Sequence, residues 1–397
     1  MAAVPKASSD PRETAAFLER NAVDSLPQGE LGRKLERAAA EGRRLRVKLG
    51  IDPTAPDIHL GHTVVLQKLR EFQDAGHDVI LIIGDFTGRV GDPSGRSALR
   101  PVLDPAEIDR NAQTFQDQAF KVLDRERTEV RRNGEWLDMP MEDLFHLVRT
   151  VTLARVTERD DFSQRLAERQ PISLLELLYP VMQGFDSVAV RADVELGGTD
   201  QKFNLLLGRD VQQAYGQDQQ AILTTPILPG LDGERRMAKS LGNYVGVTDP
   251  PEEMFGKLMS LPDAAMPIYY ELLLGQEMDA ESPAVQQKRG LARRIVERFH
   301  DSAAAAAAEA AFDRVHKEHE LPEDPAQLAA NSDVKAAIEA HVDKINQNFA
   351  RVEQVKKIAI LAQDLSQENG ELTPTLKVKR AVVAQKHEGA IEQLYAA

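Results

Sequence analysis

The chain lacks several features that would each indicate a particular class of protein. It has no cysteine, which excludes disulfides, thiolate zinc sites, iron–sulfur clusters and cysteine nucleophiles. No run of about 18 apolar residues occurs, so a transmembrane helix is excluded. Residues 1–12 contain no apolar stretch of the kind that a secretion signal needs. A cytoplasmic location is therefore expected.

Basic residues are also scarce relative to acidic ones. The 49 lysines and arginines face 63 acidic residues, for a net charge of −14, which argues against a protein that coats nucleic acid non-specifically. A local basic groove remains compatible with this balance. The 397 residues suffice for two or three domains, and 42% apolar with 28% charged residues is typical of a soluble enzyme.

Hydrophobic spacing predicts an α/β fold with a parallel sheet. Residues 47–51 and 79–83 are short runs typical of buried strands. Between them, apolar residues at three- and four-residue spacing predict a helix over 63–76. This order gives a right-handed βαβ unit. The loops 52–62 and 84–97 follow the carboxyl ends of its strands, where such sheets carry their functional sites.

The first motif is His59-Leu60-Gly61-His62, which opens the predicted helix. Two imidazoles at a helix N-terminus, with a glycine that allows close backbone approach, suit the binding and neutralisation of a polyphosphate. A chance pair of surface histidines is the alternative. Zinc is a poor alternative, because no third ligand lies close by in the sequence. No metal site is predicted.

The second motif is Arg236-Met237-Ala238-Lys239-Ser240, in a loop rich in glycine and charge that spans 226–243. Cations on such a loop can close on a phosphoryl group as charge develops on a leaving pyrophosphate. A merely solvated loop is the alternative for this motif taken alone.

Together the two motifs resemble the signature motifs of class I aminoacyl-tRNA synthetases. Within that class, residues 30–325 are similar to bacterial-type tyrosyl-tRNA synthetases. The segments that carry the resemblance are 50–55 (GIDPTA), 84–97 (GDFTGRVGDPSGRS), 179–186 (YPVMQGFD) and 197–201 (GGTDQ). The resemblance implies a Rossmann-like catalytic domain over 31–248, after an N-terminal helical segment, 1–30. It also implies an inserted helical dimerisation segment over about 105–190 and a helical anticodon-side domain over 249–325.

The resemblance assigns roles to residues at matching positions. It places Asp92, Tyr179 and Gln183 at the substrate ammonium and Asp186 at the phenol hydroxyl. Because Tyr179, Gln183 and Asp186 are four and three residues apart, one helix could present all three on nearly one face. The remaining assignments are Gln201 and Asp52 in the tyrosine site, Thr54, His59, His62, Arg236 and Lys239 in catalysis, and Gly61, Gly198, Asp200, Met237 and Ser240 at ATP.

The resemblance also implies a reaction and its partners. The tyrosine carboxylate attacks the α-phosphate of ATP, and a terminal hydroxyl of tRNA(Tyr) then attacks the tyrosyl-adenylate. Catalysis would need positioning and electrostatic stabilisation, with no covalent intermediate. Mg²⁺ would accompany ATP, and no prosthetic group is expected. The protein is expected to form a homodimer. The alternative is a synthetase-like RNA-binding or regulatory protein that does not charge tRNA.

Three positions depart from the family pattern. Lys48 stands where one branch has a tyrosine, so recognition of the phenol would rest on Asp186 and other groups. Arg236 and Ala238 stand where lysine and serine are commonest. Arginine keeps the charge but changes its geometry, and Ala238 removes one hydroxyl donor. These changes predict weaker catalysis.

The sequence pattern of residues 326–397 predicts a small α/β tail. This tail does not look like the basic S4-like RNA-binding domain that is usual in this family. The segments 349–357 (FARVEQVKK) and 370–380 (GELTPTLKVKR) instead resemble the end of AMP-forming long-chain acyl-CoA synthetases. Lys377 would match a lysine that reaches the acyl-adenylate there. A rival function, an acyl-adenylate-forming ligase, would need a second nucleotide loop that the sequence lacks. The resemblance predicts a chimeric chain joined near 322–330. The apolar pattern of the tail predicts a strand at 358–361 and a helix at 382–394.

Overall fold

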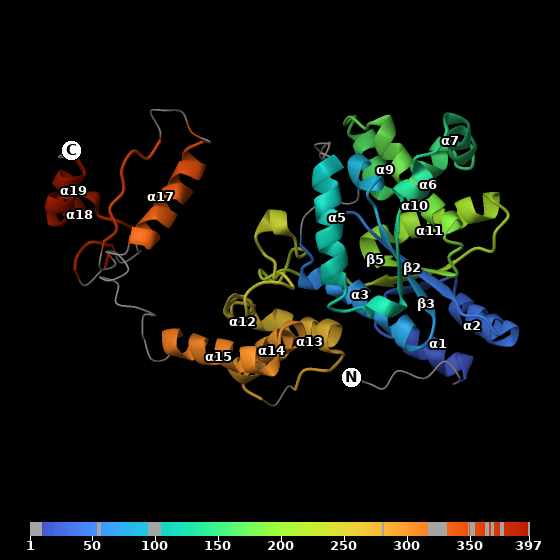
Figure 1. The fold of residues 1–397 in the computed structure, drawn as a ribbon, viewed down its shortest axis with the longest axis horizontal. Coiled ribbons are helices and arrows are strands. Elements are labelled where there is room, and N and C mark those ends of the chain that lie inside the picture. The colour runs from blue at the N-terminus through green and yellow to red at the C-terminus, as the bar shows by residue number, and fades with distance from the viewer. Residues whose placement is uncertain are drawn as a thin grey trace. The chain divides into compact units, whose positions relative to one another are not determined.

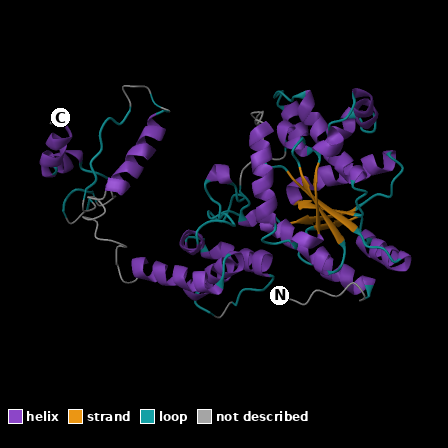
Figure 2. Ribbon diagram, viewed as in Figure 1, coloured by secondary structure: helices purple, strands orange, loops and turns teal. Residues whose placement is uncertain are grey.

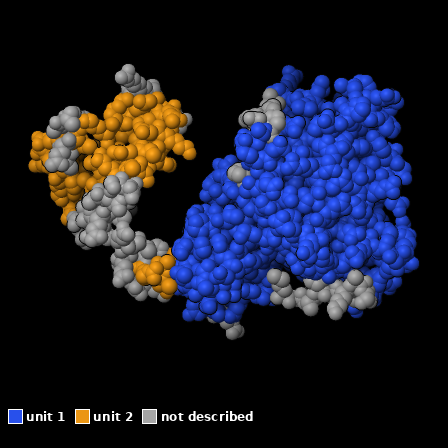
Figure 3. All heavy atoms as spheres, in the orientation of Figure 1, with its two compact units in different colours: residues 1–309 blue, residues 310–397 orange. Residues whose placement is uncertain are grey.

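The chain forms two compact units, residues 1–309 and 310–397, which are described separately (Figure 3). The structure is a computed structural model. It describes residues 10–53, 57–93, 105–279, 282–316, 332–347, 349, 354–361, 365–366, 369–373 and 377–395. The division between the units falls within helix α15, Ser302–His316. The domain bounds expected from the sequence remain predictions.

A six-stranded sheet forms the centre of the first unit (Figure 2). Its order is β1-β6-β5-β2-β3-β4, and only β1 runs antiparallel to its neighbour. The predicted α/β class with a parallel sheet is thus confirmed. The strands are β1 Asp24–Leu26, β2 Arg46–Ile51, β3 Asp78–Ile83, β4 Thr128–Arg132, β5 Val194–Gly198 and β6 Ala221–Thr225.

Helices surround the sheet (Figure 1). The crossover helix α3 contacts β2, β3, β5 and β6, and α10 packs closely on α11, which contacts β5 and β6. Ile80 and Ile82 of β3 are buried with Val190 and Ala192 at the end of α10. The helices of the catalytic part are α1 Pro11–Glu19, α2 Glu30–Glu41, α3 Leu60–Asp74, α4 Thr87–Val90, α5 Pro105–Ala119, α6 Gly134–Leu137, α7 Met141–Val148, α8 Leu153–Val156, α9 Asp160–Ala167, α10 Leu174–Ala189 and α11 Lys202–Ala214.

The remainder of the first unit is helical, as the sequence predicts beyond about residue 250. Four short 3-10 turns complete the unit: η1 Arg125–Arg127, η2 Thr199–Gln201, η3 Lys239–Leu241 and η4 Asp263–Ala265. The helices that follow the sheet are α12 Pro251–Met259, α13 Met266–Leu274, α14 Ala284–Phe299 and α15.

Two strands lie in segments that were expected to be helical. Strand β1 lies within 1–30 and pairs with β6, so this segment contributes to the sheet. Strand β4 lies within 105–190 and extends the sheet beyond β3. Its sequence, Thr-Glu-Val-Arg-Arg, is polar because it forms an edge, and it therefore lacks the apolar run that marks a buried strand.

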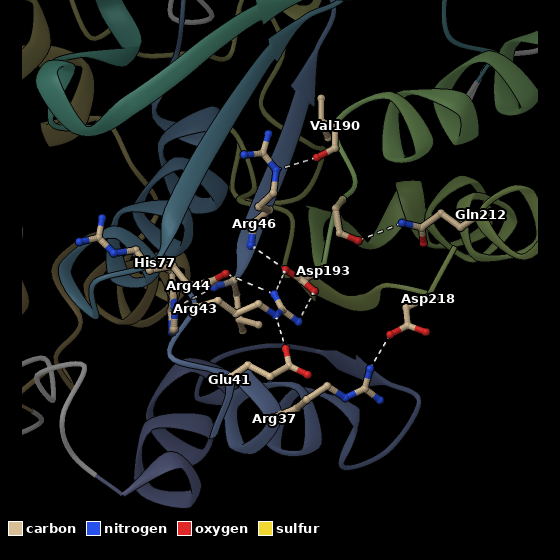
Figure 4. A network of polar contacts seen from close by, with 12 residues as sticks. Arg37, Glu41, Arg43, Arg44, Arg46, His77, Val190, Asp193, Gln212 and Asp218 are labelled. Carbon is tan, nitrogen blue, oxygen red and sulfur yellow. Dashed lines mark hydrogen bonds and ion pairs between the residues drawn. The ribbon is translucent and has the colours of Figure 1, made fainter. Parts of the chain in front are cut away.

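A polar network joins the sheet to α2 at the amino ends of β2 and β5 (Figure 4). The guanidinium of Arg43 donates to both carboxylate oxygens of Asp193, at 2.8 and 3.2 Å, and to Glu41 at 2.7 Å. The backbone amide of Arg46 donates to Asp193 at 2.9 Å, and its side chain donates to the Val190 carbonyl at 2.7 Å. These contacts fix the end of the sheet opposite the candidate site.

In the second unit, the described residues form the end of α15 and three further helices: α17 Ser332–Asn346, α18 Arg380–Lys386 and α19 Glu388–Tyr395. The strand expected at 358–361 is wrong, because these residues have no regular secondary structure. The single helix expected over 382–394 is interrupted at His387. Leu372 and Val378 form an isolated antiparallel bridge. Across the described part of the whole chain, no helix is long and apolar enough to cross a membrane.

Candidate active site

Two adjoining cavities open at the carboxyl ends of the central strands. The larger, of about 460 Å³, lies between the start of α3 and residues 236–240. The smaller, of about 260 Å³, lies between the sheet and α10. Five residues line both cavities: Asp52, His62, Val65, Gly198 and Asp200. A molecule in one cavity can therefore touch a molecule in the other.

The two histidines stack at the start of α3, with ring centroids 3.9 Å apart. The His59 amide donates to His62 Nδ1 at 3.2 Å, which caps the helix. A side chain on Gly61 would place its Cβ 3.0 Å from the His59 ring, so glycine fits here. Burial lowers the pKa of His59 to about 2, helped by His62 and Lys239, and burial and Lys239 lower that of His62 to about 4.

With these pKa values both imidazoles are neutral at pH 7 in this cavity, and in that form they can donate hydrogen bonds to a phosphate. The electrostatic role expected for the histidines remains a prediction. The lining cations of the larger cavity are Arg236 and Lys239.

The loop with Arg236 and Lys239 is held against the start of α3. The Lys239 ammonium forms an ion pair with Asp57, two residues before His59. Arg236 lies 3.9 Å from a carboxylate oxygen of Asp200. Backbone hydrogen bonds from Leu60 to Val245 and from Val247 to Ile58, at 2.9 and 3.0 Å, join the two segments. The motifs that are far apart in the sequence thus form one cavity wall.

Carboxylates and their donors line the mouth of the smaller cavity. Tyr179 Oη donates to Asp52 at 2.9 Å, and Thr87 Oγ1 donates to the other Asp52 oxygen at 2.7 Å. Gln201 Nε2 donates to Asp92 at 2.8 Å. Asp92 also lies 3.6 Å from the Arg159 guanidinium. The result is an acidic surface suited to an ammonium group.

Asp186 lies buried in the smaller cavity, opposite this acidic mouth along α10. Its carboxylate accepts hydrogen bonds from Trp136 Nε1 at 2.9 Å and from Asn133 Nδ2 at 3.5 Å. Burial raises its pKa to about 6, opposed by the charge of Lys48 and by both donors. Asp186 is therefore mostly ionised at pH 7, and its buried carboxylate can accept a hydrogen bond from a hydroxyl in this cavity.

Comparisons with known proteins agree with this geometry. Residues 40–317 match the family described as tRNA synthetases class I (W and Y). The tyrosine–tRNA ligase of Moorella thermoacetica is 52% identical over 330 residues, covering 80% of each chain. That of Geobacter sulfurreducens is 45% identical over 378 residues, covering 91% of this chain and 94% of its own.

The chain belongs to this family of class I synthetases.

Solved structures show the same fold. The tyrosyl-tRNA synthetase of Archaeoglobus fulgidus, in complex with L-tyrosine, has a TM-score of 0.61 at 24% identity, covering 75% of this chain and 99% of its own. A C-terminally truncated mitochondrial tyrosyl-tRNA synthetase of Aspergillus nidulans has a TM-score of 0.63 at 21% identity, covering 77% and 97%.

The comparisons do not support the resemblance of the tail to acyl-CoA synthetases. The match to the Geobacter sulfurreducens synthetase leaves about 36 of the 397 residues unmatched, whereas 326–397 comprises 72 residues. At least about half of the tail therefore lies within a match to a tyrosine–tRNA ligase. The chimeric origin and the special position of Lys377 have no support.

The structure places every described candidate residue of this synthetase in one of the two cavities. The larger cavity includes Asp52, His59, Gly61, His62, Gly198, Asp200, Arg236, Met237, Lys239 and Ser240. The smaller includes Asp52, Asp92, Tyr179, Gln183, Asp186 and Gln201. Thr54 lies outside the described residues. The role of each residue remains a prediction.

Several contacts in the synthetase's site are absent from the sequence prediction. Asn133 and Trp136 follow β4 and reach Asp186 because β4 pairs with β3. Arg159 and Thr87 contact the predicted carboxylates Asp92 and Asp52. Among the described residues, no group of histidine and acidic side chains could hold a metal ion.

Proposed function

We propose that this synthetase activates L-tyrosine with ATP and transfers it to the 3′ end of tRNA(Tyr). The observation that carries the proposal is the junction of the two cavities. One presents neutral imidazoles and two cations, as a polyphosphate requires, and the other ends at a buried carboxylate, as a phenol hydroxyl requires. Relatives named tyrosine–tRNA ligase at about 50% identity support the same substrate.

The smaller cavity holds tyrosine in this proposal. Its ammonium binds the acidic mouth, near Asp92, Tyr179 and Gln183, while the phenol hydroxyl donates to Asp186. Gln201 keeps Asp92 oriented through its 2.8 Å hydrogen bond. The substrate carboxylate then points towards the residues shared by both cavities, where the α-phosphate of ATP lies.

The larger cavity holds ATP, with Asp200 and Gly198 at the ribose and the start of α3 at the phosphates. Attack by the tyrosine carboxylate on the α-phosphate forms tyrosyl-adenylate and releases pyrophosphate. His59 and His62 donate hydrogen bonds to the phosphates, and Arg236 and Lys239 stabilise the charge that develops on the leaving group. Mg²⁺ would accompany ATP as part of the substrate. Lys239 must leave Asp57 to reach the pyrophosphate.

The proposal includes a homodimer. Several large apolar side chains on α7, α8, α9 and α10 are exposed to solvent. The most exposed of them is Leu174, at 80%. A second copy of this chain is the expected partner of these side chains, since large exposed apolar surface marks protein interfaces. The surface comprises Met141, Phe145, Leu153, Leu166, Leu174 and Leu175. We further propose that residues 249–325 lie on the anticodon side of bound tRNA.

The direct test of activation is ATP–pyrophosphate exchange by the purified chain, with tyrosine, phenylalanine or a long-chain fatty acid. Exchange with tyrosine alone is expected. Lys239→Ala should reduce it about a hundredfold or more, by analogy with the loss of one transition-state donor. Lys344→Ala, on the exposed side of α17, serves as the matched control. Absence of exchange with any of the three would favour an RNA-binding protein without catalysis and would contradict the proposal.

A further inference from the structure

A buried ion pair of Lys48 and Glu195 lies beneath the tyrosine cavity, and neither residue is among those assigned to substrate binding or catalysis. Lys48 of β2 and Glu195 of β5 are register partners in the sheet. Their side chains are 1% and 2% exposed, and Nζ lies 3.1 Å from Oε1. Lys48 is also the position where this chain departs from the tyrosine found in one branch of the family.

The pair faces the turn of α10 that carries the substrate-binding residues. Lys48 Nζ donates to the carbonyl oxygen of Gln183 at 3.2 Å. Glu195 accepts from Gln183 Nε2 at 3.5 Å and from Ser187 Oγ at 3.2 Å. Gln183 and Ser187 flank Asp186 in the sequence, so the pair touches α10 on both sides of the proposed phenol acceptor.

Burying such a pair costs free energy. The desolvation of two charges commonly exceeds their mutual attraction, and apolar residues of similar size are often at least as stable. Stability alone therefore does not explain why a lysine and a glutamate occupy the centre of the sheet. The buried cluster holds two carboxylates, Asp186 and Glu195, and Lys48 is the cation that acts on Asp186.

We propose that Lys48 and Glu195 are positioning residues for the phenol of tyrosine: Lys48 holds the negative charge on Asp186, and Glu195 limits how strongly it does so. An ionised Asp186 accepts a hydrogen bond from the phenol hydroxyl. A protonated Asp186 is a weaker acceptor and loses the preference for tyrosine over phenylalanine. The lysine thus supports recognition of the phenol from beneath the cavity. This inference rests on the proposed tyrosine activation.

The charged groups around Asp186 determine the direction in which each substitution should shift its pKa. Charged groups act on it from β2 (Lys48) and β5 (Glu195), and uncharged donors act from Asn133 and Trp136. Tyr179 lies on the same helix and keeps its proton. The pKa of Asp186 is raised to about 6 as the net result of opposing effects. Burial and Glu195 raise this pKa, and Lys48 lowers it. Removing Lys48 and removing Glu195 should therefore shift the titration of Asp186 in opposite directions.

The test is the pH profile of kcat/KM for tyrosine in pyrophosphate exchange, from pH 5 to 8.5. In Lys48→Met the acidic limb should move up by about one pH unit, which lowers kcat/KM at pH 6 about fivefold and leaves pH 8.5 nearly unchanged. In Glu195→Gln the limb should move down. In the double variant it should return towards the parent position. The preference for tyrosine over phenylalanine should follow the same shifts.

Lys68→Met is the matched control. Lys68 is also a buried lysine, paired with Glu71 at 2.7 Å, but it lies outside the tyrosine cavity. This variant should lose stability without moving the limb. If Lys48→Met does not fold, the downward shift in Glu195→Gln still tests the inference. An unmoved limb, or shifts of the same sign in both single variants, would overturn it. Absence of tyrosine exchange in the parent chain would instead contradict the proposed function.

Discussion

At the scale of single residues, Asp186 determines how the activity should depend on pH. Because burial raises its pKa to about 6, the carboxyl gains a proton as the pH falls through that value, and the acceptor for the phenol loses its charge. His59 and His62, with pKa values of about 2 and about 4, stay neutral above pH 5. Tyrosine-dependent exchange should therefore show one acidic limb near pH 6.

The variant Asp186→Asn checks the origin of this limb. An amide cannot titrate, so the limb should disappear, and the preference for tyrosine over phenylalanine should fall by about tenfold to a hundredfold as a charged acceptor is lost. The measurement is kcat/KM for both amino acids from pH 5 to 8. A limb that persists near pH 6 in this variant would assign it to another group.

The residues that could be found from the sequence are those that form local motifs. His59 and His62 share one helix start, and Tyr179 and Asp186 share one helix, so their spacing is enough to place them together. Trp136 could not be found in this way. It reaches Asp186 across 50 residues, through the pairing of β3 and β4, and a single sequence does not reveal strand order.

At the scale of elements, α10 carries most of the tyrosine site and is anchored by a capping box. Ser173 Oγ accepts from the Leu175 amide at 3.2 Å, and Glu176 accepts from the Ser173 amide at 3.0 Å. Ser173→Ala removes the first bond and should lower the free energy of unfolding by about 1 kcal/mol. Urea unfolding monitored by circular dichroism measures this change.

Ser163→Ala provides the matched control for the cap, because Ser163 is exposed within α9. It should change stability by less than about 0.5 kcal/mol. Equal effects of the two substitutions would show that the cap contributes little to α10.

The elements that the sequence predicts well are those with a strong apolar pattern. Strands β2 and β3 and helix α3 lie within a few residues of their expected bounds. Strand β1 has three partly buried residues, and β5 ends in two glycines, so neither forms a strong pattern. At 358–361 an apolar run predicts a strand, but the structure has none there. An apolar run forms a strand only when a neighbouring strand is available to pair with it.

At the scale of the whole molecule, the exposed apolar surface on α7–α10 predicts self-association. Leu174→Glu should convert a dimer to a monomer, because a charge buried without a partner in an interface costs several kcal/mol. Size-exclusion chromatography with light scattering measures the mass directly. Val285→Glu, at an exposed apolar position of α14 outside this surface, is the control. A parent chain that is monomeric at micromolar concentration would contradict the proposed dimer.

The proposed reaction is complete only with the transfer of tyrosine to tRNA(Tyr). The most direct measurement is the attachment of labelled tyrosine to tRNA(Tyr) by the full chain with ATP, with phenylalanine as the competing amino acid. Tyrosine should become acid-precipitable with the tRNA, and phenylalanine should not. Formation of tyrosyl-adenylate without any transfer to tRNA(Tyr) would contradict the proposed reaction.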